Sequence, residues 1–147
     1  MKGLTGKHRT KLPSGRAAPE IPSDLAHAIA AEVFRGDEIV VRDRILENFA
    51  LNNNDSPKTF VFESCILNRM SFARSKLTDL RLRDVRLVEC DFANAEATGM
   101  KVTRVAFLNC RLTGLRAVEA ECQDFLIADG DAGYSQFRFG TFTNERI

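Results

Sequence analysis

The sequence predicts an all-β solenoid, in which the chain winds into stacked coils around a narrow core. Every fifth residue from Phe62 to Ile147 is apolar, without exception over 18 positions. A second column, two residues earlier, starts at Phe60 and holds mostly apolar or small residues until Glu145 breaks it. An α-helix turns about 140° net over five residues and would scatter these positions, whereas a flat strand needs a period of two. Neither regular element explains the pattern.

The inward spacing alternates between two and three residues, which indicates short extended stretches separated by corners. With four repeats per coil, residues 20 apart would stack, as Phe72 and Phe92 do inside the core. Opposite charges at positions 20 apart support this stacking, because opposite charges are favourable between close neighbours. Arg81 and Lys101 fit less well, since they would stack as like charges. The pattern therefore favours a coil of about 20 residues without deciding it. Two outward columns then alternate in sign: Lys76, Glu96 and Arg116, and Asp91, Arg111 and Asp131.

Several segments resemble the A-[D/N]-L-x-x motif of the pentapeptide-repeat proteins. They are Ser75-Lys76-Leu77-Thr78-Asp79, Cys90-Asp91-Phe92-Ala93-Asn94, Ala95-Glu96-Ala97-Thr98-Gly99 and Cys110-Arg111-Leu112-Thr113-Gly114. The resemblance covers 60–147 and implies a right-handed quadrilateral β-helix with four repeats per coil. At the spacing of strands in a sheet, such a rod would be about 20 Å long.

The residues before the repeat are expected to form two further segments. Residues 1–21 are expected to form a flexible basic tail, since five basic residues precede the first acidic residue, Glu20. Over 22–36 the pattern predicts a short α-helix, with Ser23 as its N-cap and Gly36 at its end. Such a helix is marginal alone, so we expect its apolar stripe to dock on the solenoid. The stripe consists of Leu25, Ala28, Ile29 and Val33.

Residues 37–59 are expected to form an irregular first coil and loop. Apolar pairs such as Ile39 and Val41 recur every five residues, one residue out of the main register. The stretch Asn52-Asn53-Asn54-Asp55-Ser56-Pro57 is a loop by composition and would absorb the slip. An atypical terminal repeat of this kind is usual in solenoids.

Composition excludes several classes of protein. The 147 residues carry 21 basic and 20 acidic side chains, a net charge of +1, which gives no general attraction to nucleic acid or anionic membrane. The sequence contains no run of 18 apolar residues, so no membrane span is expected. The four cysteines all fall on the inward columns, which indicates free thiols in a reducing compartment and favours the cytoplasm.

The sequence predicts no catalytic, metal or cofactor site, and we expect no enzyme. The two histidines, His8 and His27, both precede the repeat, so no catalytic Ser/His/Asp set forms within it. The stretch Asp129-Gly130-Asp131-Ala132-Gly133 is similar to the start of a calcium loop but lacks its third ligand and terminal Glu. Cys90 and Cys110 would be neighbours across two coils, which leaves a redox role as an alternative to core packing.

Recognition is therefore expected on outward residues. One face is unusually apolar, and either the N-terminal helix or segment covers it, or a partner or second copy does. Its main residues are Ile66, Val88, Leu108 and Leu126. Charge is also graded: 60–116 holds 10 basic and 6 acidic residues, a net of +4, and 117–147 holds 2 and 6, a net of −4. Either this is a solvated surface, or it supports oriented recognition or end-to-end association. Basic residues crowd the first coils, among them Arg81, Arg83 and Arg86.

The function expected from these features is a non-catalytic protein-interaction or scaffold module with an unknown protein partner. An alternative is the role of the fluoroquinolone-resistance members of the family, which resemble DNA and modulate gyrase. That role needs a strongly acidic rod, whereas this repeat carries 12 basic and 12 acidic residues. Nucleic-acid binding through the tail and Arg81, Arg83 and Arg86 is a weaker alternative, because exposed aromatic side chains are lacking there.

Overall fold

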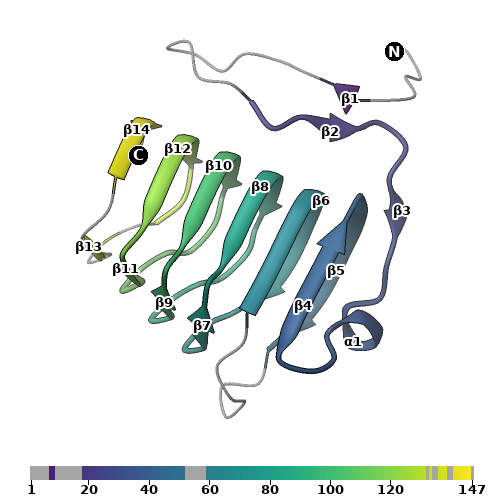
Figure 1. Cartoon of the computed structure of the whole chain (residues 1–147), viewed down its shortest axis with the longest axis horizontal. Coiled ribbons are helices and arrows are strands. Elements are labelled where there is room, and N and C mark those ends of the chain that lie inside the picture. The colour runs from purple at the N-terminus through teal and green to yellow at the C-terminus, as the bar shows by residue number, and fades with distance from the viewer. Residues whose placement is uncertain are drawn as a thin grey trace.

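The computed structural model describes residues 7–8, 18–51, 59–131, 133, 136–138 and 141–146, with side chains over 18–51, 59–131 and 133. In it the chain winds into a solenoid of parallel strands, which lie side by side along the molecule in Figure 1. The larger sheet contains β3 (Ala26–His27), β4 (Glu38–Arg42), β5 (Arg44–Ala50), β6 (Thr59–Ser71), β8 (Arg81–Val88), β10 (Lys101–Leu108), β12 (Glu121–Ala128) and β14 (Thr141–Arg146). The smaller sheet contains β7 (Lys76–Thr78), β9 (Glu96–Thr98), β11 (Arg116–Val118) and β13 (Gln136–Arg138). The chain also forms a short antiparallel pair, β1 (Lys7–His8) with β2 (Ile21–Pro22), and the helix α1 (Ala30–Val33).

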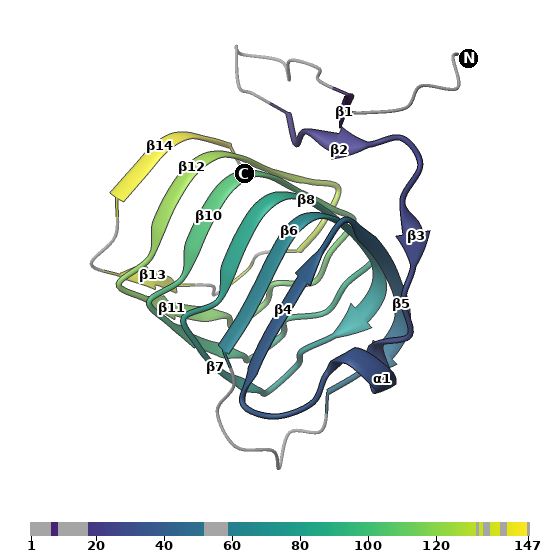
Figure 2. The same cartoon turned by 45° about the vertical axis from the view of Figure 1, so that its right-hand side comes forward.

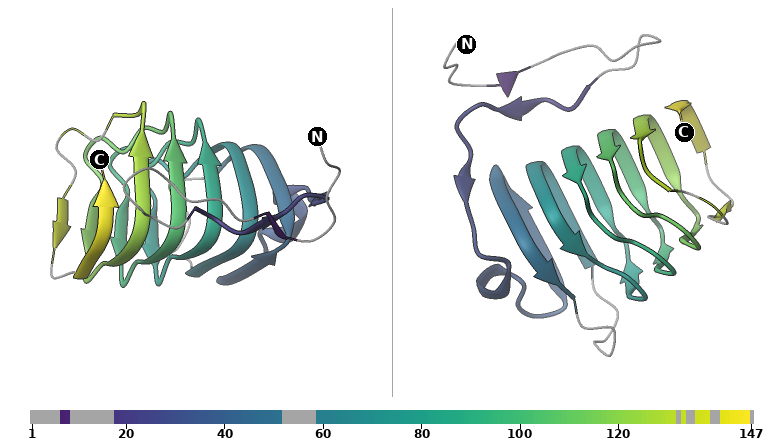
Figure 3. Two further views of the ribbon diagram at one scale, coloured as in Figure 1. Left: turned by 90° about the horizontal axis from the view of Figure 1, so that it is seen from above. Right: turned by 180° about the vertical axis from the view of Figure 1, so that it is seen from behind.

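The strand register confirms the 20-residue coil. Arg81 in β8 pairs with Lys101 in β10, which pairs with Glu121 in β12. The predicted charge columns also stack, and Arg116 Nη2 lies 2.7 Å from Glu96 Oε2 in the coil before it. Figure 3 shows the repetition of this path from two further sides.

The corners of the coil share one backbone conformation. Every fifth residue from Ser64 to Asp129 has a positive φ, between 51° and 60° for residues other than glycine. Four such corners fall in each 20-residue coil, which makes the solenoid four-sided and confirms the predicted fold class. This left-handed conformation is tolerated best by Gly, Asn and Asp, and eight of the 14 corner residues are of these types.

Both predicted inward columns are buried throughout the fully described coils. The first runs from Phe62 to Ile127 and the second from Phe60 to Phe125, and all members are at most 6% exposed. The Phe72 and Phe92 rings stack with centroids 5.0 Å apart, as the 20-residue coil requires. The last apolar positions of the first column, Ala132, Phe137, Phe142 and Ile147, have no described side chains.

The first coil is one residue longer than the others. Ile39 pairs with Phe60 and Leu46 with Leu67, an offset of 21 residues. The register therefore slips by one residue, as the apolar pairs predicted. The predicted loop Asn52-Asn53-Asn54-Asp55-Ser56-Pro57 lies outside the described residues, as does nearly all of the predicted basic tail 1–21.

The helix expected over 22–36 is wrong for most of its length. α1 spans only Ala30–Val33 and has no side-chain cap, and Ile29 is 61% exposed instead of docked. Residues 26–27 instead form β3, which pairs with β5. Strand β5 offers an open edge of backbone groups, and a 12-residue helix has little stability of its own, so strand pairing prevails. Among the described residues, no helix is long and apolar enough to cross a membrane.

Phe34 covers the core at the N-terminal end of the solenoid, beside the first coil. Its ring meets Phe49 and Phe60 edge to face, at centroid distances of 5.3 and 5.1 Å. α1 lies beside β5 in both Figure 1 and Figure 2, so the chain turns inward directly after the helix. Of the expected stripe, Ile29 and Val33 stay exposed and Ala28 packs partly buried against the core, while Phe34, the residue after the stripe, docks most deeply.

Strain at the corners can be measured at Glu119, an exposed residue with φ of 59°. We expect Glu119→Val to lower the free energy of unfolding by about 1–3 kcal/mol, because a β-branched residue is poorly tolerated at positive φ. Glu119→Asn should leave stability unchanged or raise it by up to about 1 kcal/mol. Urea unfolding of both variants provides the measurement, and equal stability for the two would contradict the role of the corner.

Candidate interaction surface

The predicted apolar face consists of two neighbouring outward columns. Ile66 and Leu126 share one column, and Val88 and Leu108 share the next, two residues further along each strand. All four side chains are half-buried. Arg86 lies in the first column, directly beside Ile66. The four predicted residues are therefore brought together, but a charged side chain stands among them.

The N-terminal segment 18–22 lies against one corner of the solenoid. Ala18 and Ile21 are buried, and β2 contacts β6. Figures 1 and 2 show β2 close to one end of β6. The backbone N–H of Glu20 donates to Asp84 Oδ1 over 3.0 Å. The docked N-terminal element is thus this extended segment, a few residues before the expected helix.

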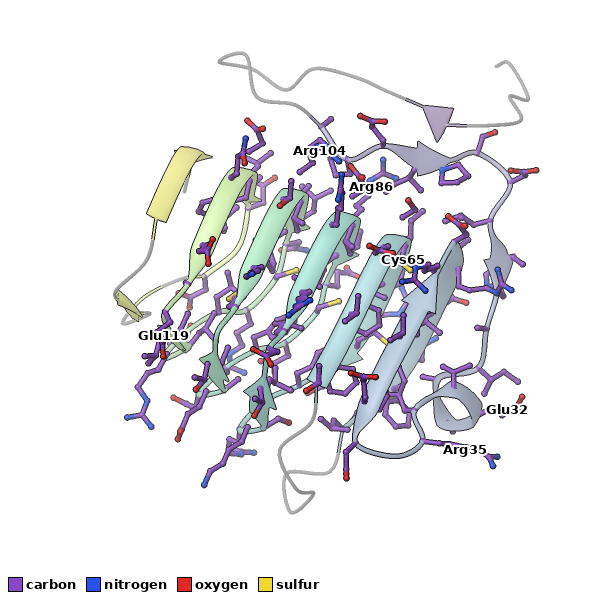
Figure 4. All side chains as sticks on the ribbon, in the orientation of Figure 1. Glu32, Arg35, Cys65, Arg86, Arg104 and Glu119 are labelled. Atoms are coloured by element: carbon purple, nitrogen blue, oxygen red, sulfur yellow. The ribbon has the colours of Figure 1, made fainter. Side chains whose placement is uncertain are left out.

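A bidentate ion pair holds that corner together. Arg104 Nε donates to Asp84 Oδ1 over 2.6 Å, and Arg104 Nη2 donates to Asp84 Oδ2 over 2.9 Å. Both are corner residues of adjacent coils, and Figure 4 shows Arg104 close to β2. Burial acts to raise the pKa of Asp84, but the hydrogen bonds from Arg104 and from the Glu20 backbone outweigh it and hold the pKa below its usual value. The pair anchors the N-terminal segment.

A different face of the solenoid carries a cluster of cations. Arg81 and Arg83 point outward from β8, and Lys101 lies beside Arg81 on β10. The face continues onto β6 and β4, where Val61 and Val40 occupy the same outward column as Arg81. We call this surface the basic face and define it as Val40, Arg42, Val61, Arg81, Arg83 and Lys101. Together with Glu63, Thr103 and two core residues, Phe62 and Leu82, it lines an open groove of about 360 Å³.

The charges of the basic face are only partly compensated. Arg42 pairs with Glu63 on the neighbouring strand. Within the described ranges, no carboxylate lies within ion-pair distance of Arg81, Arg83 or Lys101. Like charges directly opposite each other on adjacent strands are destabilising. Arg81 and Lys101 therefore form a like-charged pair on adjacent strands, in contrast to the two outward columns through Arg116 and Arg111, which alternate in sign.

The predicted cation trio is split by the structure. Arg81 and Arg83 share the basic face, whereas Arg86 follows the corner at Asp84 and lies half-buried on the next face. The sequence pattern placed Lys101 beside Arg81 but did not assign it to the interaction surface, and the predicted surface also lacked Arg42 and the two valines. The signal was available, since these residues lie 20 or 21 positions from others in the same outward columns.

Several other charged side chains on the described surface form ion pairs. His27 Nδ1 lies 3.5 Å from Glu47 Oε1, and Arg69 reaches both Glu47 and Glu89 at 3.8 and 3.6 Å. Asp131 Oδ1 accepts a hydrogen bond from the Gly133 N–H over 3.0 Å, which stabilises the turn that resembled a calcium loop. No three His, Cys, Asp or Glu side chains of the described residues are grouped so that they could hold a metal ion.

The four cysteines are free thiols buried in the core, at most 3% exposed. Cys90 and Cys110 stack in adjacent coils, and their thiols donate to Leu67 and Leu87 carbonyl oxygens over 3.3 and 3.4 Å. The pKa of Cys90 lies above its usual value because of its hydrogen bond with Cys110 and its burial. Thiols enclosed in the core are out of reach of solutes, which favours core packing over redox chemistry.

Comparison with known proteins adds little to this description. No protein-family model matches the sequence. No curated protein matches it either. One similar solved structure is the crystal structure of a pentapeptide repeat protein, Rfr23, from the cyanobacterium Cyanothece 51142. The similarity covers 76% of this chain and 66% of that one, just under two thirds, with 13% identity and a TM-score of 0.35. The five-residue repeats, the two inward columns and the four corners per coil are nevertheless the features that the pentapeptide-repeat resemblance predicts.

The anchor at the corner predicts a pH-dependent stability. Asp84→Asn should lower the free energy of unfolding at neutral pH by on the order of 2 kcal/mol, because the partners of the carboxylate lose a charged acceptor while Asn keeps the backbone conformation. Since the pKa is depressed on folding, this stabilisation is present above the unfolded value of about 3.9 and is lost as pH falls toward the folded-state pKa.

Urea unfolding at several pH values measures this effect. The difference between wild type and Asp84→Asn should be full from about pH 5 to pH 8 and shrink below about pH 4. Asp129→Asn, at an exposed corner, is the matched control and should change stability little. A constant difference down to about pH 2.5 would show that the charge of Asp84 does not anchor the segment.

Proposed function

We propose that this protein is a non-catalytic protein-interaction module and that the basic face is its docking surface. The observation that supports this most is the group of three exposed cations, Arg81, Arg83 and Lys101, without ion-pair partners among the described residues. Uncompensated like charges lower the stability of the free protein, and an anionic partner would offset that cost.

The shape of the face also favours a protein partner. The strands beneath it belong to one parallel sheet, so the side chains stand on a regular, rigid surface that needs little ordering on binding. Val40 is 44% exposed at its edge, which adds an apolar contact to the charges. Apart from Ser75, the inward positions from Phe60 to Ile127 are filled by apolar side chains, which leaves recognition to outward residues.

The alternative role as a DNA mimic has less support. A mimic of DNA presents a row of negative charge, and the described face with uncompensated charge is positive. The half-buried apolar columns are a weaker docking candidate than the basic face, because the N-terminal segment already lies at the corner beside them. End-to-end association stays a prediction, because nearly all side chains after Asp131 lie outside the described residues.

The test is an affinity capture with matched charge variants. Tagged wild type should retain a partner that Arg81→Glu/Arg83→Glu loses. Arg74→Glu should retain it, since Arg74 is an exposed corner residue outside the basic face. Urea unfolding of each variant checks that the fold persists. The proposal fails if the double variant captures the same proteins as wild type, or if wild type captures none above the untagged background.

A further inference from the structure

We propose that the occupant of the basic face is a short acidic segment of a partner protein, in which carboxylates are followed by apolar side chains. This inference rests on the proposed function and specifies its partner. It combines two features of the same face: the cations on β8 and β10, and the valines on β4 and β6.

The spacing of the side chains fits an extended peptide that crosses the strands. Neighbouring strands lie about 4.8 Å apart, so Lys101, Arg81, Val61 and Val40 form a row about 14 Å long. An extended peptide presents a side chain to the same surface about every 6.6 Å. Three successive facing residues therefore span the row.

The order of residues along the row separates acidic from apolar side chains in the peptide. Acidic side chains would meet Lys101 and Arg81, and Arg83 lies two residues along β8 from Arg81, within reach of the same carboxylates. Apolar side chains two to four residues further on would then meet Val61 and Val40. Arginine pairs well with carboxylates because its planar guanidinium offers parallel donors.

The borders of the face argue against a longer polyanion. Glu121 follows Lys101 in the same column on β12, and Glu63 lies beside Arg83 in the next column. These carboxylates would repel a nucleic acid that continued along the rod. Three phosphate contacts would also give only weak, strongly salt-dependent binding. The side chains that form the basic face include no aromatic ring on which a base could stack.

Direct binding of a synthetic peptide tests the inference. The probe is fluorescein-labelled Gly-Ser-Glu-Asp-Glu-Ser-Leu-Gly-Leu-Gly, measured by fluorescence anisotropy at low and at physiological salt. We expect saturable binding to wild type that weakens with salt and falls more than about tenfold in Arg81→Glu/Arg83→Glu. Arg74→Glu should bind within about twofold of wild type, because its changed charge lies on another face.

Two further measurements separate the charged from the apolar contribution. A peptide with Gln in place of the acidic residues should not bind. Val40→Thr, which removes an apolar contact without adding charge, should weaken binding of the acidic peptide several-fold, and since Val40 is exposed, the variant is expected to fold. If binding is unchanged by the Val40 substitution but is lost when Arg81 and Arg83 are changed, the apolar half of the proposed peptide is wrong.

The outcomes distinguish this inference from the proposed function. If the acidic peptide does not bind even at low salt while captured proteins still depend on Arg81 and Arg83, the docking surface stands and the acidic segment is wrong. If a single-stranded oligonucleotide of equal charge binds more tightly than the peptide, the occupant is a nucleic acid and the inference is overturned. If capture is indifferent to the arginines, the proposed function itself fails.

Discussion

The corner at every fifth residue is the constraint on which the rest of this structure depends. A positive φ at each corner turns the chain after a short extended stretch, and four corners return it to its starting side after 20 residues. Several corners are occupied by Arg or Glu, for which the left-handed conformation costs about 1 kcal/mol or more. The hydrogen-bonded ladders and the buried apolar columns offset that cost, so corner and core are mutually dependent.

Regular stacking also determines the electrostatics of the surface. Because residues 20 apart are direct neighbours, one substitution changes the contacts with the neighbours in the coil before and in the coil after. The columns through Arg116 and Arg111 place each of these arginines beside a carboxylate of the coil before. Asp84 and Arg104 use the same geometry at a corner, where they hold the N-terminal segment. The column through Arg81 departs from this alternation, and its departure is the main reason for assigning a binding role to the basic face.

The core could be predicted from the five-residue spacing of apolar residues. The structure of the N-terminal part could not be predicted from local sequence patterns. The two inward columns, the 20-residue coil and the one-residue slip before Phe60 all follow from spacing. The helix failed because residues 26–27 complete the open edge of β5, a tertiary effect that overrides weak helical preference. The bond from Glu20 to Asp84 joins residues 64 apart and has no periodic signal. The abundance of Asp, Asn and Gly at corner positions was a usable signal, since those residues best tolerate positive φ.

Residue-resolved NMR can show whether recognition takes place on the basic face. The acidic probe peptide would be titrated into isotope-labelled protein while backbone amide shifts are followed. Binding on the basic face should confine the shifts to 40–42, 61–63, 81–83 and 101–103, which stack on adjacent strands. Shifts centred instead on β7, β9 and β11, or on the columns of Ile66 and Val88, would contradict it.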